Sequence, residues 1–415
     1  MKDVIVVGTS QKLIFRKEIF MYAVGIDVSK GKSTIAINFN GQLVIKPFEI
    51  KHTDNGFKIL LDKISTFKKE DVKFVMEATG IYHLPILLKL LELKYFVCVE
   101  NAFLIKKYFD VNLRKVKTDK KDAIKLANYC SDKWNVLKRY NIQDNTYEEL
   151  KFLSRQYNQQ ISLKVKAKVQ LGNLIDLTFP NFSAPFNIES QYLFMLDVYE
   201  KYYHPNLIVQ LEEKTFVENI QEIAQKRGHR TGLRIGIELY NLAKETIPTR
   251  PSNNYTQLAV TSCVDSLRSI EKATNDIISQ MNELAKELPE YEIVRKMKGV
   301  GKKICPRIIA EVGDIRKYKN ANSLIASAGI DVPPYQSGKF TANNIHISKR
   351  GNKYLRKCGY EIMKSLKATK PTNDSAVYDY IVKKEIEGKP SNVCKIAGLN
   401  KFLRIYYARV KEIYK

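Results

Sequence analysis

With 415 residues, the chain is long enough for two or three domains, each with its own hydrophobic core. Lysine and arginine number 69 against 44 acidic residues, and a net charge of +25 favours a polyanionic partner such as nucleic acid, which relieves the self-repulsion. A ribosome-associated or membrane-surface protein would share this charge. However, no run of about 18 apolar residues without charge is present, so we expect no transmembrane helix.

The expected elements begin at Met21, where translation could start, and residues 1–20 are interpreted as an N-terminal extension. In chain order, the patterns up to residue 140 predict strands 22–27, 33–38 and 43–50, helix 56–67, strand 73–76, helix 84–93 and strand 95–100. Three strands followed by strand–helix–strand alternation are the order of the ribonuclease H-like fold. Residues 21–140 are therefore predicted to form an α/β domain, a mixed sheet with helices on its faces.

Residues 141–290 are predicted to be mainly helical, with an inserted helical subdomain between Phe179 and Pro251. The last part has apolar residues three and four apart, the spacing of a coiled coil. This seam could join two chains, or it could belong to a long amphipathic helix packed within its own chain against an earlier helix, 150–161, in antiparallel orientation. The seam consists of Val260, Cys263, Leu267, Ile270, Thr274, Ile277, Met281, Leu284 and Leu288.

Residues 291–415 are predicted to form a compact, mainly helical C-terminal domain, in which the tail after Pro371 is basic but contains no recognisable motif. The run 298–303, Lys-Gly-Val-Gly-Lys-Lys, resembles the turn of a helix-hairpin-helix, whose backbone N–H groups can hold a phosphate. Glycine turns are common, so the motif alone is a weak signal. Lys302 and Lys303 strengthen it and are candidate nucleic-acid contacts.

Four acidic residues of the first domain occupy unusual places. Asp27 ends an apolar strand, and Glu77 follows another, so each lies at the carboxyl end of its strand. Asp119 and Asp122 begin a helix that Thr118 is placed to cap, and their spacing puts both on one face. Taken singly, Asp119 and Asp122 are ordinary N-terminal helix acids and Asp27 could start a turn. Together in a basic protein, the four predict a catalytic group.

Carboxylates that converge without histidine or cysteine suit hard divalent cations. We therefore expect Mg²⁺, or Mn²⁺, bound by Asp27, Glu77, Asp119 and Asp122. Two such ions about 3.5–4 Å apart can activate the attacking oxygen and stabilise the leaving oxygen of a phosphodiester.

A second group of candidate residues lies in the C-terminal domain. Pro333–Gly338 predicts a stiff loop that presents the hydroxyl of Ser337, which by chemistry alone would most often be a turn serine. The turn 348–356 leads into a helix and is rich in cations that could contact phosphates. The candidate contacts in and around the motifs of the two domains are Lys117, Lys339, Lys349, Arg350, Lys353 and Arg356.

Three segments of the first domain resemble the DEDD motifs of the insertion-sequence 110 transposase family: Val24–Lys30, Met76–Tyr82 and Lys117–Ala123. Asp27, Glu77, Asp119 and Asp122 match the four acids one for one. The loop around Ser337 and the turn after it are similar to the family's second, transposase domain. The resemblance covers about residues 21–140 and 291–370, and the stretch between them is longer than in compact members.

The resemblance implies a RuvC-like first domain, similar to Holliday-junction resolvases, whose carboxylates bind magnesium. It implies that Ser337 attacks DNA and forms a covalent phosphoserine link. It also implies donor and target DNA as substrates, recognition through a structured guide RNA encoded by the element, and a synaptic homo-tetramer with sites composed of two subunits. Nothing in the residues themselves indicates the RNA.

Two other functions fit the same residues. A junction-resolving nuclease would use the carboxylates to hydrolyse DNA with water and would not need Ser337. A catalytically inert nucleic-acid-binding protein would need none of the four carboxylates. The six cysteines form no CxxC pair, which argues against a zinc site or disulfide framework. That pattern, together with the absence of a secretory apolar segment at the N-terminus, predicts a cytoplasmic protein.

Overall fold

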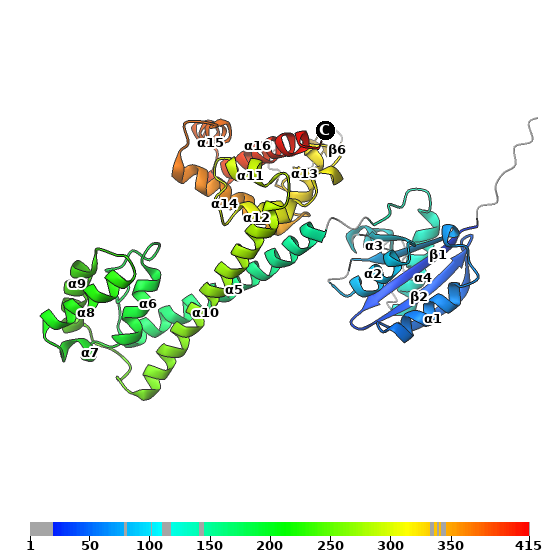
Figure 1. Cartoon of the computed structure of the whole chain (residues 1–415). Coiled ribbons are helices and arrows are strands. Elements are labelled where there is room, and N and C mark those ends of the chain that lie inside the picture. The colour runs from blue at the N-terminus through cyan, green and yellow to red at the C-terminus, as the bar shows by residue number, and fades with distance from the viewer. Residues whose placement is uncertain are drawn as a thin grey trace, which may run out of the picture. The chain divides into compact units, whose positions relative to one another are not determined.

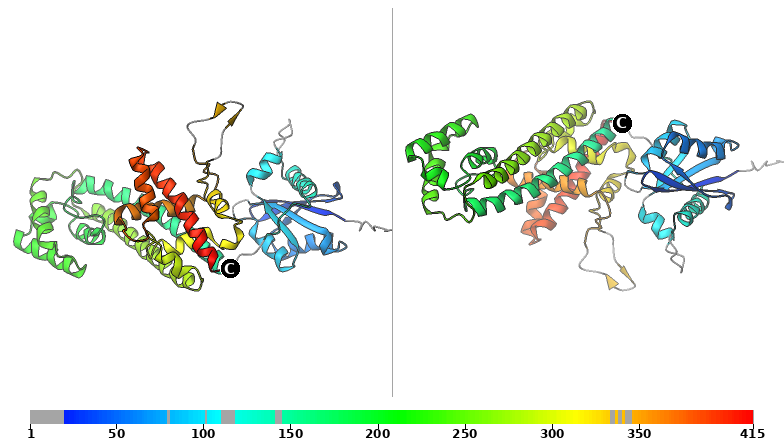
Figure 2. Two further views of the ribbon diagram at one scale, coloured as in Figure 1. Left: turned by 90° about the horizontal axis from the view of Figure 1, so that it is seen from above. Right: turned by 90° about the horizontal axis from the view of Figure 1, so that it is seen from below.

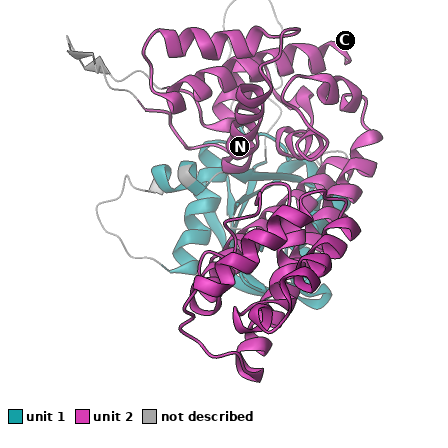
Figure 3. Cartoon of the chain, turned by 90° about the vertical axis from the view of Figure 1, so that its left-hand side faces the viewer, with its two compact units in different colours: residues 1–142 teal, residues 143–415 magenta. Residues whose placement is uncertain are grey.

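The structure, a computed structural model, describes residues 20–78, 81–100, 102–109, 118–140, 145–332, 336–337, 340–341 and 346–414. The chain divides into two compact units, residues 1–142 and 143–415, which Figure 3 distinguishes by colour. Unit 1 contains a five-stranded sheet, and unit 2 contains the long helices, the C-terminal helices and a short two-stranded sheet. The predicted combination of a mixed N-terminal sheet with a mostly helical remainder is thereby confirmed.

Unit 1 is built on a five-stranded sheet with the order β3-β2-β1-β4-β5. The central strand β1 pairs antiparallel with β2 and parallel with β4. The β2–β3 connection is the two-residue turn Asn40–Gly41, in which both residues have positive φ, as a hairpin turn of type I′ requires. The strands are β1 Tyr22–Ser29, β2 Lys32–Phe39, β3 Gln42–Lys51, β4 Val72–Glu77 and β5 Phe96–Glu100.

Helices cover both faces of this sheet (Figure 2). Side chains alternate between the faces, so Val24 and Ile26 of β1 pack with α1 and α2, whereas Ala23 packs with α3 and α4. The first helix starts two residues earlier than predicted and ends at Ile64, because Thr53 caps it by accepting a hydrogen bond from the Gly56 N–H. The elements are α1 Asp54–Ile64, the 3-10 turn η1 Lys69–Asp71, α2 Leu84–Glu92, α3 Ala102–Phe109 and α4 Asp119–Asp132.

Two long helices, α5 Asn145–Thr178 and α10 Asn254–Lys286, form the spine of unit 2 (Figure 1). Leu150 near the start of α5 shares a core with Met281 near the end of α10, and Leu171 shares another with Val264. The helices therefore run antiparallel and pack within one chain, as one of the two interpretations of the seam expected. A coiled coil between chains stays a prediction.

The buried stripe of α10 differs from the predicted seam in its second half. The seam named Ile277 and Leu284, whereas the structure buries Ile278 and Ala285 and leaves the predicted pair only partly buried. A straight helix has 3.6 residues per turn, so its buried face drifts away from a strict heptad repeat.

The part of the chain that connects α5 to α10 forms a group of short helices with an aromatic core. Phe182, Phe194 and Phe216 are fully buried there, together with Tyr199 from the same cluster. This core explains the poor heptad periodicity of the stretch, because short helices bury their faces against one another. The helices are α6 Tyr192–Lys201, α7 Asn206–Val209, α8 Glu213–Lys226 and α9 Gly232–Glu245.

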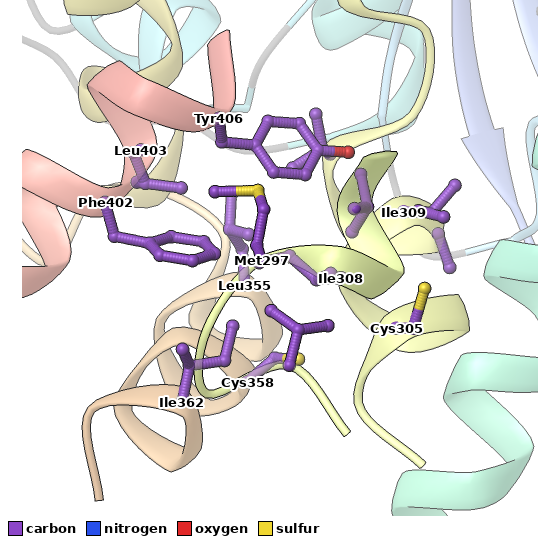
Figure 4. Packing of buried hydrophobic residues seen from close by; sticks show 14 of the residues in the cluster. Met297, Cys305, Ile308, Ile309, Leu355, Cys358, Ile362, Phe402, Leu403 and Tyr406 are labelled. Atoms are coloured by element: carbon purple, nitrogen blue, oxygen red, sulfur yellow. The ribbon is translucent and has the colours of Figure 1, made fainter. Parts of the chain in front are cut away.

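The C-terminal helices share one core with the short, entirely buried helix α12, which packs directly on α11 and α14; Figure 4 shows Ile308, Leu355 and Phe402 in this core. The tail after Pro371 supplies two of these helices, and α16 contributes Phe402 and Tyr406 to the core. Among the described residues, no helix is both long and apolar enough to cross a membrane. The elements are α11 Tyr291–Lys296, α12 Cys305–Val312, η2 Ile315–Lys317, α13 Ala321–Ala328, β6 Gln336–Ser337, β7 Phe340–Thr341, α14 Lys353–Thr369, α15 Ala376–Ile386 and α16 Ser391–Glu412.

Candidate active site

Asp27 and Glu77 lie next to each other at the carboxyl edge of the sheet. The parallel strands β1 and β4 pair up to Ile26 and Met76, and the two acids are the next residues. Both are partly buried. Because side chains alternate along a strand, Asp27 lies on the same face as Gly25, which α4 covers, and Glu77 lies on the same face as Val75, which packs with α4.

The helix α4 lies unusually close to β1 because Gly25 has no side chain. A Cβ atom at Gly25 would be 2.2 Å from the backbone nitrogen of Ala127 and 2.4 Å from the carbonyl oxygen of Ala123. No residue with a side chain fits in that space.

The direction of α4 follows from contacts at its two ends. The Asn128 side-chain oxygen accepts a 2.7 Å hydrogen bond from Asn38, which pairs with Ala23 near the start of β1. At the other end, the pKa of Lys32 is raised mainly by its hydrogen bond to Glu49, with a smaller attraction from Asp119. Since Lys32 pairs with the last residue of β1, the N-terminus of α4 lies at the same edge as Asp27.

Asp119 and Asp122 occupy the first turn of α4. Thr118 caps this helix as predicted, because its hydroxyl accepts a 3.3 Å hydrogen bond from the Lys121 N–H. The Asp122 side chain is 16% exposed and pairs with Lys125 at 3.2 Å, whereas Asp119 is exposed. The fold therefore brings all four predicted carboxylates to one end and one face of the sheet.

The donor chemistry of this edge fits a hard divalent cation, since every candidate ligand is a carboxylate oxygen. Within the described part of the chain, however, no three acidic, histidine or cysteine side chains are gathered closely enough to hold a metal ion as they stand. The four acids are thus placed along a shared edge without closing around one point. An ion there would require their side chains to converge further.

A fifth carboxylate at this edge, Glu100, was missed by the sequence analysis. It ends β5 and pairs in register with Glu77. The Cys98 thiol donates a 3.5 Å hydrogen bond to it, and the pKa of Tyr129 is raised to about 12 by burial, with a further contribution from Glu100. The available signal was its position, because Glu100 ends a buried strand as Glu77 does.

The predicted nucleophile belongs to unit 2. Ser337 is the second residue of β6 and pairs with Phe340 of β7. Its side chain is not described, and Pro333, Gly338 and Lys339 lie outside the described residues. Where the chain re-enters the described part, Ser348 donates a 2.6 Å hydrogen bond from its hydroxyl to the Asp331 carboxylate. The two ends of the loop are therefore tied together.

The base of this loop is braced further by the turn before α14. Asn352 caps α14 by accepting from two backbone N–H groups, and Arg356 donates to the carbonyl oxygens of Ala328 at 2.8 Å and Gly351 at 3.1 Å. A Cβ atom at Gly351 would be 2.2 Å from the carbonyl oxygen of Ser327. The predicted phosphate contact Arg356 thus has a bracing role in this structure.

The other predicted nucleic-acid contacts are spread over unit 2. Lys302 and Lys303 are exposed on the turn before α12, and Lys349 and Arg350 are exposed on the turn before α14. Lys353 is exposed in the first turn of α14. Lys117 falls outside the described residues. Each of these side chains stays a predicted contact.

Comparison with known proteins defines the class. Residues 24–180 match a family of DEDD transposases of the IS110 type, and residues 291–378 match a second family, the transposases of IS116, IS110 and IS902. The α/β unit contains the four acids, and the helical unit follows it. Each of the two units matches transposases, so the protein is a transposase.

A relative encoded by an insertion element agrees with this assignment. The chain is 23% identical over 371 residues, 88% of each chain, to the uncharacterized 44.8 kDa protein of insertion element IS116 from Streptomyces clavuligerus. The protein belongs to the IS116/IS110/IS902 family of transposases. The resemblance noted from the DEDD and serine motifs is thereby confirmed.

Proposed function

We propose that this transposase cuts and rejoins DNA strands through a covalent phosphoserine at Ser337, assisted by the four carboxylates of a RuvC-like unit 1. The observation that supports it best is the placement of Asp27, Glu77 and the first turn of α4 along one edge of the sheet. The mixed five-stranded sheet with helices on both faces is compatible with a ribonuclease H-like fold, which agrees with this role.

In the proposed cleavage step, the Ser337 hydroxyl oxygen attacks the scissile phosphorus and gives up its proton to solvent. A new O–P bond forms, and the bond from phosphorus to the leaving deoxyribose oxygen breaks, so that oxygen takes up a proton. The energy of the phosphodiester is kept in the serine ester. Attack by an incoming DNA hydroxyl then reverses the step and frees Ser337, with no need for ATP.

Magnesium or manganese held by Asp27, Glu77, Asp119 and Asp122 would neutralise charge on the scissile phosphate. The contribution of the chain is to hold these carboxylates at one edge. Asp27 and Glu77 are fixed by the pairing of β1 with β4, and Asp119 and Asp122 are fixed by the close approach of α4 to Gly25.

Donor and target DNA are the proposed substrates, a structured RNA is the proposed guide, and a tetramer is the proposed assembly. The support from this chain is its net charge of +25, which suits several nucleic-acid strands bound at once. The proposals of a guide RNA and of a tetramer are based on the resemblance to the family.

The test is denaturing gel electrophoresis of the purified protein with end-labelled donor DNA, guide RNA and Mg²⁺. We expect wild-type protein to yield a labelled protein–DNA adduct that resists denaturation, and Ser337→Ala to lose both adduct and strand exchange while still binding DNA. Asp27→Asn should lose breakage altogether. If Ser337→Ala cleaves normally and releases free ends, the protein is a water-using nuclease. If Asp27→Asn also cleaves, the carboxylate assignment is wrong.

A further inference from the structure

A basic pocket of about 610 Å³ opens on unit 2 between the middle of α5 and the first two turns of α14. Three of its lining residues are cations, namely Arg155 of α5 and Lys353 and Lys357 of α14. The rest of the lining consists of amide and hydroxyl side chains and one tyrosine ring, and none of the lining residues is acidic. Only Lys353 was among the contacts predicted from the sequence.

A buried carboxylate behind the pocket holds together the two helices that form the pocket wall. Glu311 of α12 has a side chain only 1% exposed, and it accepts hydrogen bonds of 2.7 Å from each of three groups. Because Arg155 comes from α5 and Asn352 caps α14, this one acid joins the two helices that form the pocket. The three donors are Ser154, Arg155 and Asn352.

The cations are held in defined positions. The Arg155 guanidinium stacks 3.8 Å from the centre of the Tyr354 ring, a contact that a planar guanidinium makes well. The Lys357 ammonium donates a 3.3 Å hydrogen bond to the Asn158 side chain, which in turn donates to the carbonyl oxygen of Ser154. Contacts within unit 2 therefore hold Arg155 and Lys357 in place.

The placement of these lysines opposes the usual rule for helix ends. A helix N-terminus bears partial positive charge and favours acidic residues, yet the first turn of α14 has no acidic residue and begins with Lys353. One turn further, Lys357 adds a second cation on the same side of the helix. Like charges gathered at a positive helix end are unfavourable for folding and favourable for binding an anion.

We propose that this pocket binds backbone phosphates of nucleic acid, with Lys353 and Lys357 as phosphate contacts and with Arg155, whose charge Glu311 balances, fixing the wall beside them. Gln159 and Ser162 on the α5 side supply neutral hydrogen-bonding groups for the sugar–phosphate chain. The inference rests on the proposed function, because it assigns part of the nucleic acid that the transposase handles to a particular surface. Duplex DNA and structured RNA share this chemistry.

The test measures the affinity of the full-length protein for a labelled DNA duplex and for a labelled structured RNA between 50 and 300 mM NaCl. The double variant Lys353→Gln/Lys357→Gln should bind at least one of them about tenfold more weakly at low salt. Each lost duplex contact should reduce the slope of log affinity against log salt by about 0.9, so two should reduce it by about 1.8. The nucleic acid that loses affinity identifies the occupant.

The matched control is Lys214→Gln/Lys272→Gln, which removes the same charge from exposed positions on α8 and α10 outside the pocket. We expect it to change affinity less than twofold, and neither double variant to melt at a lower temperature than the wild type. If the pocket variant binds both nucleic acids as the control does, the pocket proposal is wrong. Because this assay measures binding and not adduct formation, its outcome is independent of the Ser337→Ala test.

Discussion

Gly25 determines how closely α4 packs on the sheet. It therefore also determines the distance from Asp27 and Glu77 to the two acids of the first turn of α4. Any side chain there would meet the backbone of α4 at Ala123 and Ala127, and a backbone cannot move aside as a flexible side chain can. Small residues continue this contact, since Ala36 of β2 is buried against the same helix. The first turn of α4 can therefore lie next to Asp27 and Glu77 only if α4 packs directly against these small residues.

Gly25→Ala tests this dependence. The added methyl group should push α4 away from β1, lower the stability of unit 1 by about 1–3 kcal/mol or more, and abolish Mg²⁺-dependent DNA breakage. Urea unfolding and the adduct assay measure the two effects. Gly172→Ala is the matched control, because nothing lies within 4 Å of that position in α5, so we expect it to raise stability by up to about 1 kcal/mol. Normal breakage by Gly25→Ala would show that the site does not need the close packing of α4.

At the residue scale, the sequence predicted what depends on local order along the chain. The strand end at Glu77 and the cap at Thr118 follow from apolar runs and from the residue types that stop or start them. The predicted strand end at Asp27 is two residues short, because β1 continues to Ser29 through its pairing with β2. Contacts between distant segments were not predictable in this way. Glu100 meets Glu77 only through sheet pairing, and Glu311 meets Asn352 only because two helices pack together.

At the scale of elements, periodicity predicted which helices exist and less well how they pack. The antiparallel pairing of α5 with α10 was anticipated from apolar spacing, but the buried face drifts by one residue along α10. The C-terminal helix α16 was not predicted, although Leu399, Phe402 and Tyr406 have helical spacing and are fully or almost fully buried. Polar residues between them, two of them basic (Lys401 and Arg404), hide this pattern in a simple inspection of hydrophobicity.

A buried cluster of polar side chains connects the start of α5 with the end of the chain. Tyr147 donates a 2.5 Å hydrogen bond to one oxygen of Glu290, and Tyr414 donates a 2.8 Å hydrogen bond to the other. Tyr147 and Glu290 are 2% and 1% exposed. Burial raises the pKa of Tyr147, and its hydrogen bonds to Glu290 and Tyr414 raise it further.

This cluster predicts a loss of stability in alkali. Because the folded pKa of Tyr147 lies above the unfolded value of about 10, its contribution is complete below pH 10 and falls by about 1.4 kcal/mol per pH unit above it. Tyr147→Phe should cost about 1–3 kcal/mol at pH 8, since Glu290 loses a donor, and should lose less stability than wild type between pH 10 and pH 11. Urea unfolding at the three pH values measures both effects.

The control for this comparison is Tyr255→Phe, which changes a tyrosine that is 81% exposed. We expect its stability to follow that of the wild type at every pH. An equal alkaline slope in wild type and Tyr147→Phe would mean that Tyr147 ionises as readily in the folded protein as in the unfolded chain.

At the scale of the whole molecule, each described hydrophobic cluster draws its residues from one unit. Three clusters belong to unit 1, and two belong to unit 2, where α5 and α10 contribute to both. A unit with its own core can unfold on its own. Calorimetry of the intact chain should therefore resolve separate transitions for residues 1–142 and 143–415, and the separately expressed units should melt at matching temperatures. Failure of either unit to fold alone would contradict this.

The same measurement locates the proposed metal. All four proposed ligands belong to unit 1, so Mg²⁺ should raise the melting temperature of the unit 1 transition and leave that of unit 2 unchanged. A ligand that binds only the folded state stabilises it by RT ln(1 + [L]/Kd), which is about 2.7 kcal/mol at a concentration one hundred times the Kd. Asp27→Asn removes one of the proposed ligands, so it should lose most of the shift with Mg²⁺. A shift in melting temperature that is confined to unit 2, or one that Asp27→Asn retains in full, would place the bound ion away from the edge of the sheet where the four acids lie.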